Sequence, residues 1–267
     1  MSDGAPEPGP WPGSGHLRRT VVDGVLRLTI DHEPRLNALT GATMRGLVAA
    51  LEQAGTDESV RVVVLTGAGR AFCSGADLSD IGGEDADPEA IMAGAELLVR
   101  SVVETPVPVV ARVHGPAVGI GMSLALAADL AYVGPEAYLL QSFLSIGLMP
   151  DGGSTLLLAA AMGRARANEA VLLGRRIPGA EAAEHGLVAG AASTIDELDA
   201  LVERAVARCV AAPRRAVVLT KEAMLAAALP GLGEALAREG QGQRELLRSA
   251  DFAERAQALL SRSSARA

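Results

Sequence analysis

The chain begins with a spacing of apolar residues that is typical of a strand and then changes to that of a helix. Residues 26–30 alternate between apolar and polar side chains directly after the tight-turn dipeptide Asp23-Gly24, which predicts a hairpin with a half-buried strand. Apolar residues recur at helical intervals over 44–51 and predict a helix that ends near Gly55. The N-terminal part is therefore expected to hold a hairpin followed by a helix.

Short apolar runs with many β-branched residues follow further along the chain. They cover residues 60–66, 107–113, 130–133 and 138–140. Runs of this length predict buried strands, and helical segments lie between them. Strands that alternate with helices are typical of an α/β domain with parallel pairing.

The pattern changes near Thr194, after which strand-like runs are no longer found. Helical spacing continues over 197–210, 215–228, 232–248 and 252–260. We therefore predict a Gly- and Pro-rich disordered tail over 1–16, an α/β core over 17–193 and a C-terminal helical region over 194–267. This last region can pack on its own core or on a neighbouring subunit. Its apolar stripes, at Leu232, Leu236, Leu246 and Leu247, are more than a lone core is expected to cover, which favours a trimer or hexamer.

Composition limits the classes of partner. Aromatic residues make up only 2% of the chain, so the core must be built from aliphatic side chains. The net charge of −8, without a basic stripe, argues against nucleic acid as a partner. Lys221 is the only lysine, so positive charge for an anionic ligand must come mainly from arginine.

Cysteine usage and apolar run length indicate the cellular compartment. Cys73 and Cys209 lie far apart, which favours reduced thiols over a disulfide framework. The N-terminus lacks a signal-peptide pattern, and no apolar run reaches the about 18 residues of a membrane span. We therefore expect a cytoplasmic protein without a membrane span.

Three glycine-containing segments carry the candidate chemistry: 60–78, 114–124 and 146–155. Free N–H groups at such turns and helix N-termini can accept negative charge, and two that converge on one carbonyl oxygen form an oxyanion hole. Each segment alone is also explained as a tight turn between core elements. A dinucleotide-binding fingerprint, a Walker lysine, a Cys/His metal cluster and a G-x-S-x-G elbow are all absent from the sequence.

In this order, and together with 31–39, 181–188 and 219–221, these segments resemble the enoyl-CoA hydratase/isomerase (crotonase) family over about residues 17 to 250. The resemblance implies a spiral of β-β-α units followed by a C-terminal helical trimerisation region. It also implies a homotrimer or homohexamer that acts on acyl-CoA in fatty acid metabolism. No metal or redox cofactor is implied, because coenzyme A is part of the thioester substrate.

The resemblance also assigns roles to individual residues. The oxyanion donors would be the N–H groups of Ala76 and Ile120, and Ile120 stands where the family usually has glycine, which is expected to narrow the site. The implied substrate-binding residues are Arg35, Arg70, Ser74, Gly75, Asp77, Leu78, Gly119, Ser123 and Phe143. Of these, Arg70 and Arg35 would lie near the CoA phosphates, and residues 74–78 would line the CoA path.

The chain departs from the hydratase pattern at the two positions that handle water. The hydratase glutamates correspond to Ser123 and Phe143, neither of which can act as a carboxylate acid–base, so water addition is not expected. Asp151 stands where several isomerases of the family carry their acid–base carboxylate, and it also matches the nucleophilic aspartate of the aroyl-CoA dehalogenase branch. The alternative is that Asp151 only caps the helix that begins there.

Other reactive residues are given structural roles. His114 is expected to form a structural hydrogen bond, His185 to lie at a surface helix end, and Cys73 to be a small buried residue. Lys221 is interpreted as a helix-surface residue or a ligand-phosphate contact.

The sequence therefore predicts an enoyl-CoA isomerase, favoured over a hydratase (a lyase), with Asp151 as the acid–base. Two alternatives stay open. One is a non-catalytic acyl-CoA-binding protein, and the other is a slow hydratase that uses water bound to Ser123.

Overall fold

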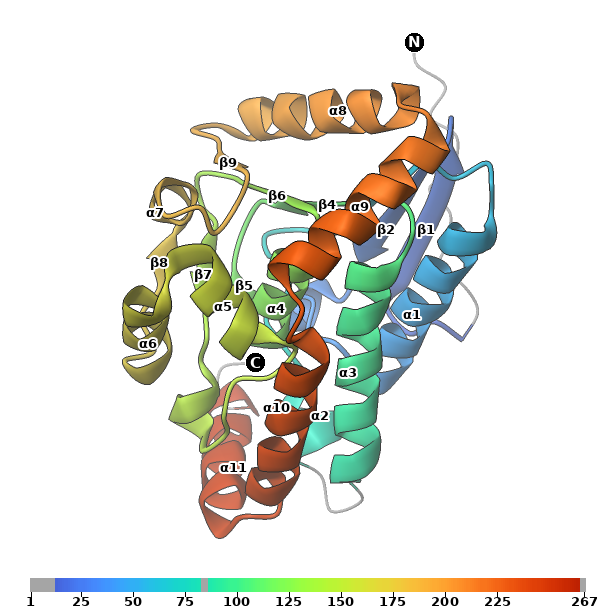
Figure 1. The fold of residues 1–267 in the computed structure, drawn as a ribbon. Helices are drawn as coiled ribbons and strands as arrows, with labels where there is room; N and C mark the ends of the chain where they lie inside the picture. The colour runs from blue at the N-terminus through green and yellow to red at the C-terminus, as the bar shows by residue number, and fades with distance from the viewer. Residues whose placement is uncertain (1–12, 83–85, 265–267) are drawn as a thin grey trace.

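The computed structural model, shown in Figure 1, describes residues 13–82 and 86–264. Its larger sheet has six strands. Its strands, in spatial order, are β1 (Leu17–Val22), β2 (Val25–Ile30), β3 (Val62–Gly67), β4 (Val109–Val113), β6 (Leu130–Val133) and β9 (Gly190–Ala191). The β1–β2 hairpin is antiparallel and all other pairs are parallel. The predicted parallel α/β core is confirmed, and the hairpin turns at Asp23 and Gly24, whose φ angles are 50° and 78°.

A small second sheet lies beside the first. It contains β5 (Ala117–Val118), β7 (Tyr138–Leu140) and β8 (Ile177–Pro178). Of these strands the sequence predicted only β7, because strands of two residues are too short to show a periodic pattern.

The helices of the core pack around these sheets. They are α1 (Gly41–Thr56), α2 (Leu78–Ile81), α3 (Pro88–Glu104), α4 (Ile120–Ala127), α5 (Ser154–Met162), α6 (Arg164–Leu172) and α7 (Gly179–Glu184), with the short 3-10 helices η1 (Glu33–Arg35) and η2 (Phe143–Ile146). The sequence analysis did not predict α3, although its start is encoded locally. The Asp87 side chain accepts a hydrogen bond from the Glu89 N–H, and Pro88 occupies the first turn.

Strand β3 is buried on both faces, which explains its continuous apolar run. Val63 and Leu65 belong to the main core with α1, α3 and α4. Val62 and Val64 point to the opposite face, where they pack against α8 (Ile195–Ala211). The large sheet is thus covered by helices on both faces.

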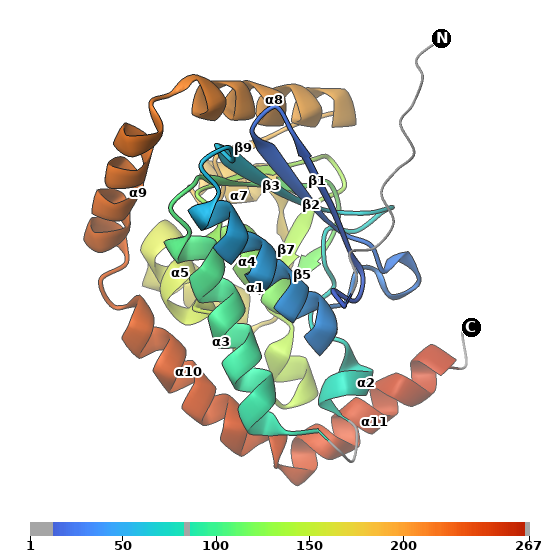
Figure 2. The same ribbon diagram turned by 90° about the vertical axis from the view of Figure 1, so that its right-hand side faces the viewer.

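The C-terminal helices form an outer arc around α1 and α3 (Figure 2). After α8 they are α9 (Arg214–Ala228), α10 (Leu232–Leu247) and α11 (Ala250–Ser264). Helix α10 packs along α3, and α11 contacts η2 and α2.

This arrangement corrects the role predicted for the apolar stripes. Leu232 and Leu236 are 5% and 3% exposed and belong to the core of their own subunit. Leu246 and Leu247 are partly buried against the cluster of Phe143 and Phe252. The chain folds its C-terminal helices back onto itself, so these leucines do not need another subunit to cover them.

The N-terminal segment is described only in part. Of the predicted tail, residues 1–12 lie outside the described residues. Ser14 is buried, and the N–H of His16 donates a hydrogen bond of 3.1 Å to the Thr43 hydroxyl, so residues 13–16 pack on α1.

In the described part of the chain, no single helix is long and apolar enough to cross a membrane. Only the bent pair α9 and α10, with an angle of 61° between them, has the length and composition for it.

Candidate active site

Two glycine-bearing loops lie side by side at the centre of the molecule. The loop after β3 and the segment before α4 are joined by a parallel bridge between Cys73 and Ala117, and the Val118 N–H donates to the Cys73 carbonyl at 2.9 Å. Gly119 precedes α4 with φ 55° and ψ −126°, a conformation that side chains with a Cβ rarely adopt. The turn into α4 therefore depends on glycine.

The N–H groups of Ala76 and Ile120 lie on these two loops. Ile120 is the first residue of α4, so its N–H has no partner within the helix. Neither N–H donates a hydrogen bond to any backbone acceptor in the described part of the chain. Two unused donors on adjacent loops are what an oxyanion hole requires.

Asp151 does not cap α5, which removes the capping alternative. The N-cap residue of α5 is Gly153, which has no side chain that could accept a capping hydrogen bond. Instead, the carboxylate of Glu239 on α10 accepts hydrogen bonds from the Gly153 N–H at 2.6 Å and the Thr155 N–H at 2.9 Å. The Glu239 carboxylate, from a distant helix, thus caps the N-terminus of α5, and the Asp151 side chain does not.

The Asp151 carboxyl group is buried, with the residue 7% exposed. Its Oδ2 accepts a hydrogen bond of 2.9 Å from Nε2 of Gln243, whereas its Oδ1 has no hydrogen-bond partner among the described residues. Burial raises the pKa of Asp151 to about 7; the hydrogen bond from Gln243 opposes this rise, and the negative charge of Glu239 adds to it. Such a carboxyl group can both take and return a proton near neutral pH.

The two positions of the hydratase glutamates hold groups that cannot replace a carboxylate. Ser123 is fully buried, and its hydroxyl donates to the Asp151 backbone carbonyl at 2.8 Å. The Phe143 ring lies beside Gly119 and packs with Leu148 and Phe252. Ser123 therefore anchors the Asp151 loop, and Phe143 forms an apolar wall near the oxyanion loops.

The residues assigned to the CoA path have local structural partners. The Asp77 carboxylate caps α2, which starts at Leu78, by accepting from the Ser79 N–H at 2.9 Å. Although burial acts to raise the pKa of Asp77, the hydrogen bonds from Ser79 outweigh it and lower the pKa. Ser74 donates from its hydroxyl to the Arg35 carbonyl at 2.9 Å, so η1 and the segment containing Gly75 are held together.

Arg35, at the end of η1, and Arg70, in the loop after β3, are both exposed. Neither forms an ion pair with a described carboxylate. Both guanidinium groups are therefore available for an anionic ligand. Within the described part of the chain, no cluster of three His, Cys, Asp or Glu side chains could hold a metal ion.

Three potentially reactive residues, His114, Cys73 and His185, were expected to have structural roles. The His114 ring nitrogen Nε2 lies 2.9 Å from the Gly69 carbonyl, as expected of a structural hydrogen bond. Burial raises the pKa of Cys73 to about 12, which makes it a poor nucleophile. His185 follows the last residue of α7, where its side chain is 17% exposed.

The interpretation of Lys221 is corrected. Its side chain is only 9% exposed, and its Nζ lies 2.7 Å from Oδ2 of Asp129. It also donates to the Val107 carbonyl at 3.2 Å. The lysine therefore ties α9 to the core and is neither a surface residue nor free for a ligand phosphate.

A groove of about 940 Å³ runs between α1 and α3. Leu39 lines it and also pairs with Ala76 in a parallel bridge, so the groove opens beside the oxyanion loop. The apolar side chains that line it from the two helices include Met44, Val48, Ala90, Ile91 and Leu97, with Gly94 among them. Charged residues also line it: Arg45, Glu52, Asp80 and Asp87. Helix α3 forms one wall of this groove.

The sequence analysis missed Glu239 and Gln243. They lie 88 and 92 residues after Asp151, and their contacts depend on how α10 folds back. One signal was present: both stand on the buried face of α10 that carries Leu232 and Leu236, where polar side chains are unusual.

The fold and site define an α/β protein in which two free backbone N–H groups lie on adjacent loops and a buried carboxyl group has one unpartnered oxygen. The family model described as enoyl-CoA hydratase/isomerase matches residues 20–265, and the chain belongs to this family of acyl-CoA-processing enzymes.

Individual relatives agree with this assignment. A probable enoyl-CoA hydratase of Rhodobacter capsulatus is 39% identical over 91% of this chain and 94% of that protein. The 1,2-epoxyphenylacetyl-CoA isomerase of Escherichia coli is 34% identical over 91% of this chain and 95% of that protein. The crystal structure of an enoyl-CoA hydratase from Mycobacterium avium subsp. paratuberculosis superposes with a TM-score of 0.85, at 43% identity over 93% of this chain and 96% of that one.

Proposed function

We propose that this enzyme shifts a double bond in an enoyl-CoA thioester and that Asp151 is its acid–base. The observation that carries the proposal is the buried Asp151 carboxyl group, which has no capping role and a free Oδ1. A relative named 1,2-epoxyphenylacetyl-CoA isomerase also supports an isomerase.

The reaction follows from the two halves of the site. Asp151 removes a proton from C2 of a 3-enoyl-CoA, and the electron pair moves onto the thioester oxygen as a dienolate. The N–H groups of Ala76 and Ile120 hold that oxygen, and each such donor can lower the barrier by about 3 kcal/mol. Asp151 then returns the proton at C4, so that the double bond lies between C2 and C3 without net gain or loss of atoms.

The coenzyme A part of the substrate would lie along the loop that follows β3. Ser74, Gly75, Asp77 and Leu78 would line the CoA path, with Gly119 across from it, as the family resemblance implies. Arg35 and Arg70 would meet the CoA phosphates, since both are exposed arginines beside that path. The groove between α1 and α3 would take the acyl chain.

Slow hydration is the second candidate, because most of the similar proteins are named hydratases. The side chains at the glutamate positions argue against it. Positioned acid–base groups supply about 10²–10⁴-fold each, so the loss of both should reduce hydration by several orders of magnitude.

Comparison of substrates tests the proposal. We expect 3-enoyl-CoA isomerisation to exceed crotonyl-CoA hydration and Asp151→Asn to abolish it, measured by conjugated-enoyl absorbance. Fast hydration that persists in Asp151→Asn would contradict the mechanism. Saturable acyl-CoA binding by calorimetry without turnover of any 2- or 3-enoyl-CoA would favour a non-catalytic binding protein.

A further inference from the structure

The side chain of Gln243 bridges the two residues that flank Pro150. Its Oε1 accepts a hydrogen bond of 3.2 Å from the Met149 N–H, and its Nε2 donates the 2.9 Å hydrogen bond to Oδ2 of Asp151. The glutamine is 1% exposed. One buried amide thus holds both the backbone before Pro150 and the carboxyl group after it.

The Met149 contact determines the orientation of the amide. A backbone N–H can only donate, so the atom that faces it must be the glutamine oxygen. The other amide atom is then the NH₂ group, which can only donate to Asp151. Oδ2 of Asp151 is therefore the acceptor. Because a carbonyl oxygen accepts a hydrogen bond better than a hydroxyl oxygen does, protonation of the carboxyl group is favoured on Oδ1.

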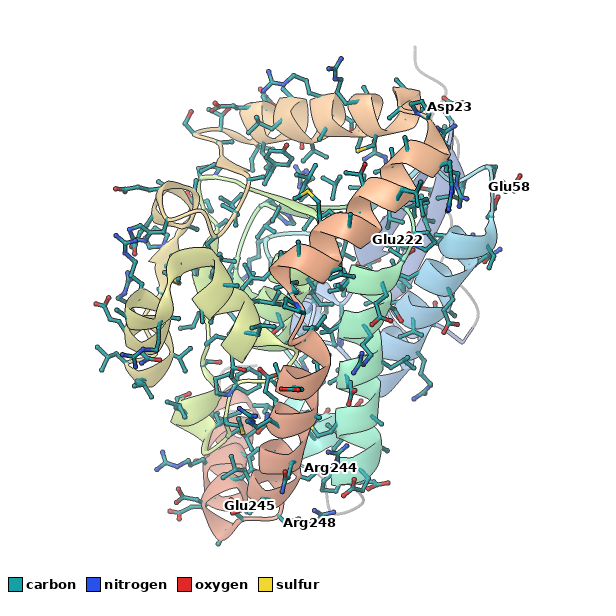
Figure 3. All side chains as sticks on the ribbon, viewed as in Figure 1. Asp23, Glu58, Glu222, Arg244, Glu245 and Arg248 are labelled. Carbon is teal, nitrogen blue, oxygen red and sulfur yellow. The ribbon has the colours of Figure 1, made fainter. Side chains whose placement is uncertain are left out.

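Helix α10 contacts its neighbours close to Gln243. Gly242 lies against the flexible Met149 side chain, where a Cβ on Gly242 would lie 2.3 Å from the Met149 sulfur. Arg244 on α10 and Arg248 directly after it, both labelled in Figure 3, pair with Glu89 in the first turn of α3, at 2.5 and 3.0 Å. The amide is thus carried by an anchored helix.

We propose that Gln243 is a positioning residue, which holds Oδ2 of Asp151 and so assigns Oδ1 as the oxygen that takes and returns the substrate proton. This role rests on the proposed acid–base function of Asp151. Through Gln243, helix α10 then belongs to the site, although it supplies no group that touches the reacting atoms.

Few charged groups surround Asp151, so the effect of the Gln243 hydrogen bond on the pKa of Asp151 can be measured. Of the elements packed against it, α10 supplies the carboxylate of Glu239, whereas α4 supplies the neutral Ser123 and has no charged residue. Helix α5 and η2 have no charged residue either. Loss of the Gln243 N–H removes a group that lowers the pKa of Asp151, so the pKa should rise.

The test uses Gln243→Leu and Gln243→Glu, with Gln241→Leu as the matched control because Gln241 is exposed on the same helix. We expect kcat to fall about 10–100-fold in both Gln243 variants, with little change of KM and with the acid limb of the kcat profile moved to higher pH. Gln241→Leu should match the wild type. Gln243→Glu keeps an acceptor for the Met149 N–H, so the loop retains that hydrogen bond if Gln243→Leu folds poorly.

A titration without substrate separates the two proposals. In protein labelled with carboxyl-¹³C aspartate, the Asp151 resonance is the one missing from Asp151→Asn, and its pKa should be higher in Gln243→Leu than in the wild type. Unchanged kcat and unchanged titration in both Gln243 variants would overturn the positioning role, as would a fall in kcat with the wild-type pH profile and titration. Full isomerisation by Asp151→Asn would instead overturn the proposed function.

Discussion

At the scale of the residue, burial of the Asp151 carboxyl group makes the stability of the fold depend on pH. A carboxyl group transferred from water into an apolar site resists ionisation, and here burial moves its pKa from 3.8 to about 7. The folded state therefore binds this proton more tightly than the unfolded state does. The resulting stabilisation is complete below pH 4 and is lost as the pH rises through 7.

This linkage predicts a pH-dependent gain in Asp151→Asn. Because the variant has no proton to lose, it should become more stable than the wild type as the pH rises, by about 2–4 kcal/mol at pH 8.5. Urea unfolding between pH 4.5 and 8.5 measures the difference.

Asp251→Asn serves as the control, because the Asp251 side chain on α11 is 73% exposed. Its stability should follow the wild type over the whole pH range. A gap between Asp151→Asn and the wild type that does not grow with pH would show that the carboxyl group is not held protonated by the fold.

At the scale of the element, α3 forms one wall of the groove that we assign to the acyl chain. Gly94 lies on that wall, and a Cβ added there would meet no atom within 4 Å. The position is therefore open space toward the groove, and it tolerates a side chain without a backbone change.

Gly94→Trp should fill part of the groove. We expect kcat/KM for long-chain 3-enoyl-CoA to fall at least tenfold, with C4 and C6 substrates affected much less. The control is Gly94→Ala, which should keep the wild-type selectivity and stabilise α3 by about 0.5–1 kcal/mol, since alanine is a better helix former than glycine. Equal losses on short and long substrates would place the acyl chain elsewhere.

At the scale of the whole molecule, the arc of C-terminal helices leaves apolar side chains on its outer side. Leu219 and Met224 on α9 are 47% and 65% exposed, although the leucines first expected to be uncovered are buried or partly buried. The chain therefore still presents apolar surface that a second copy could cover.

We predict that the enzyme is a trimer or hexamer and that Met224→Arg weakens the assembly if α9 contributes to the interface. Light scattering at micromolar concentration measures the mass. Glu222→Gln is the control, since it changes a polar side chain of the same helix, labelled in Figure 3. A monomeric mass for the wild type would contradict the prediction.

Local patterns explain why much of the fold could be predicted from the sequence. The Asp23-Gly24 turn, the apolar run of β3 and the periodic C-terminal helices each depend on neighbouring residues, so each can be recognised within a short window. The assignment of Ala76 and Ile120 as oxyanion donors also came from a local motif, that of the family, and it stays a prediction.

Only the tertiary structure determines the hydrogen-bond partners and the pKa of Asp151. The sequence left open whether it caps α5 or serves as an acid–base, and the answer depends on Glu239 and Gln243, which reach it only because α10 folds back on its own core. Burial, which raises the pKa of Asp151, is likewise a sum over contacts from distant elements. Residue identity determined that a carboxyl group was present, but only packing could determine what partners and what proton affinity it has.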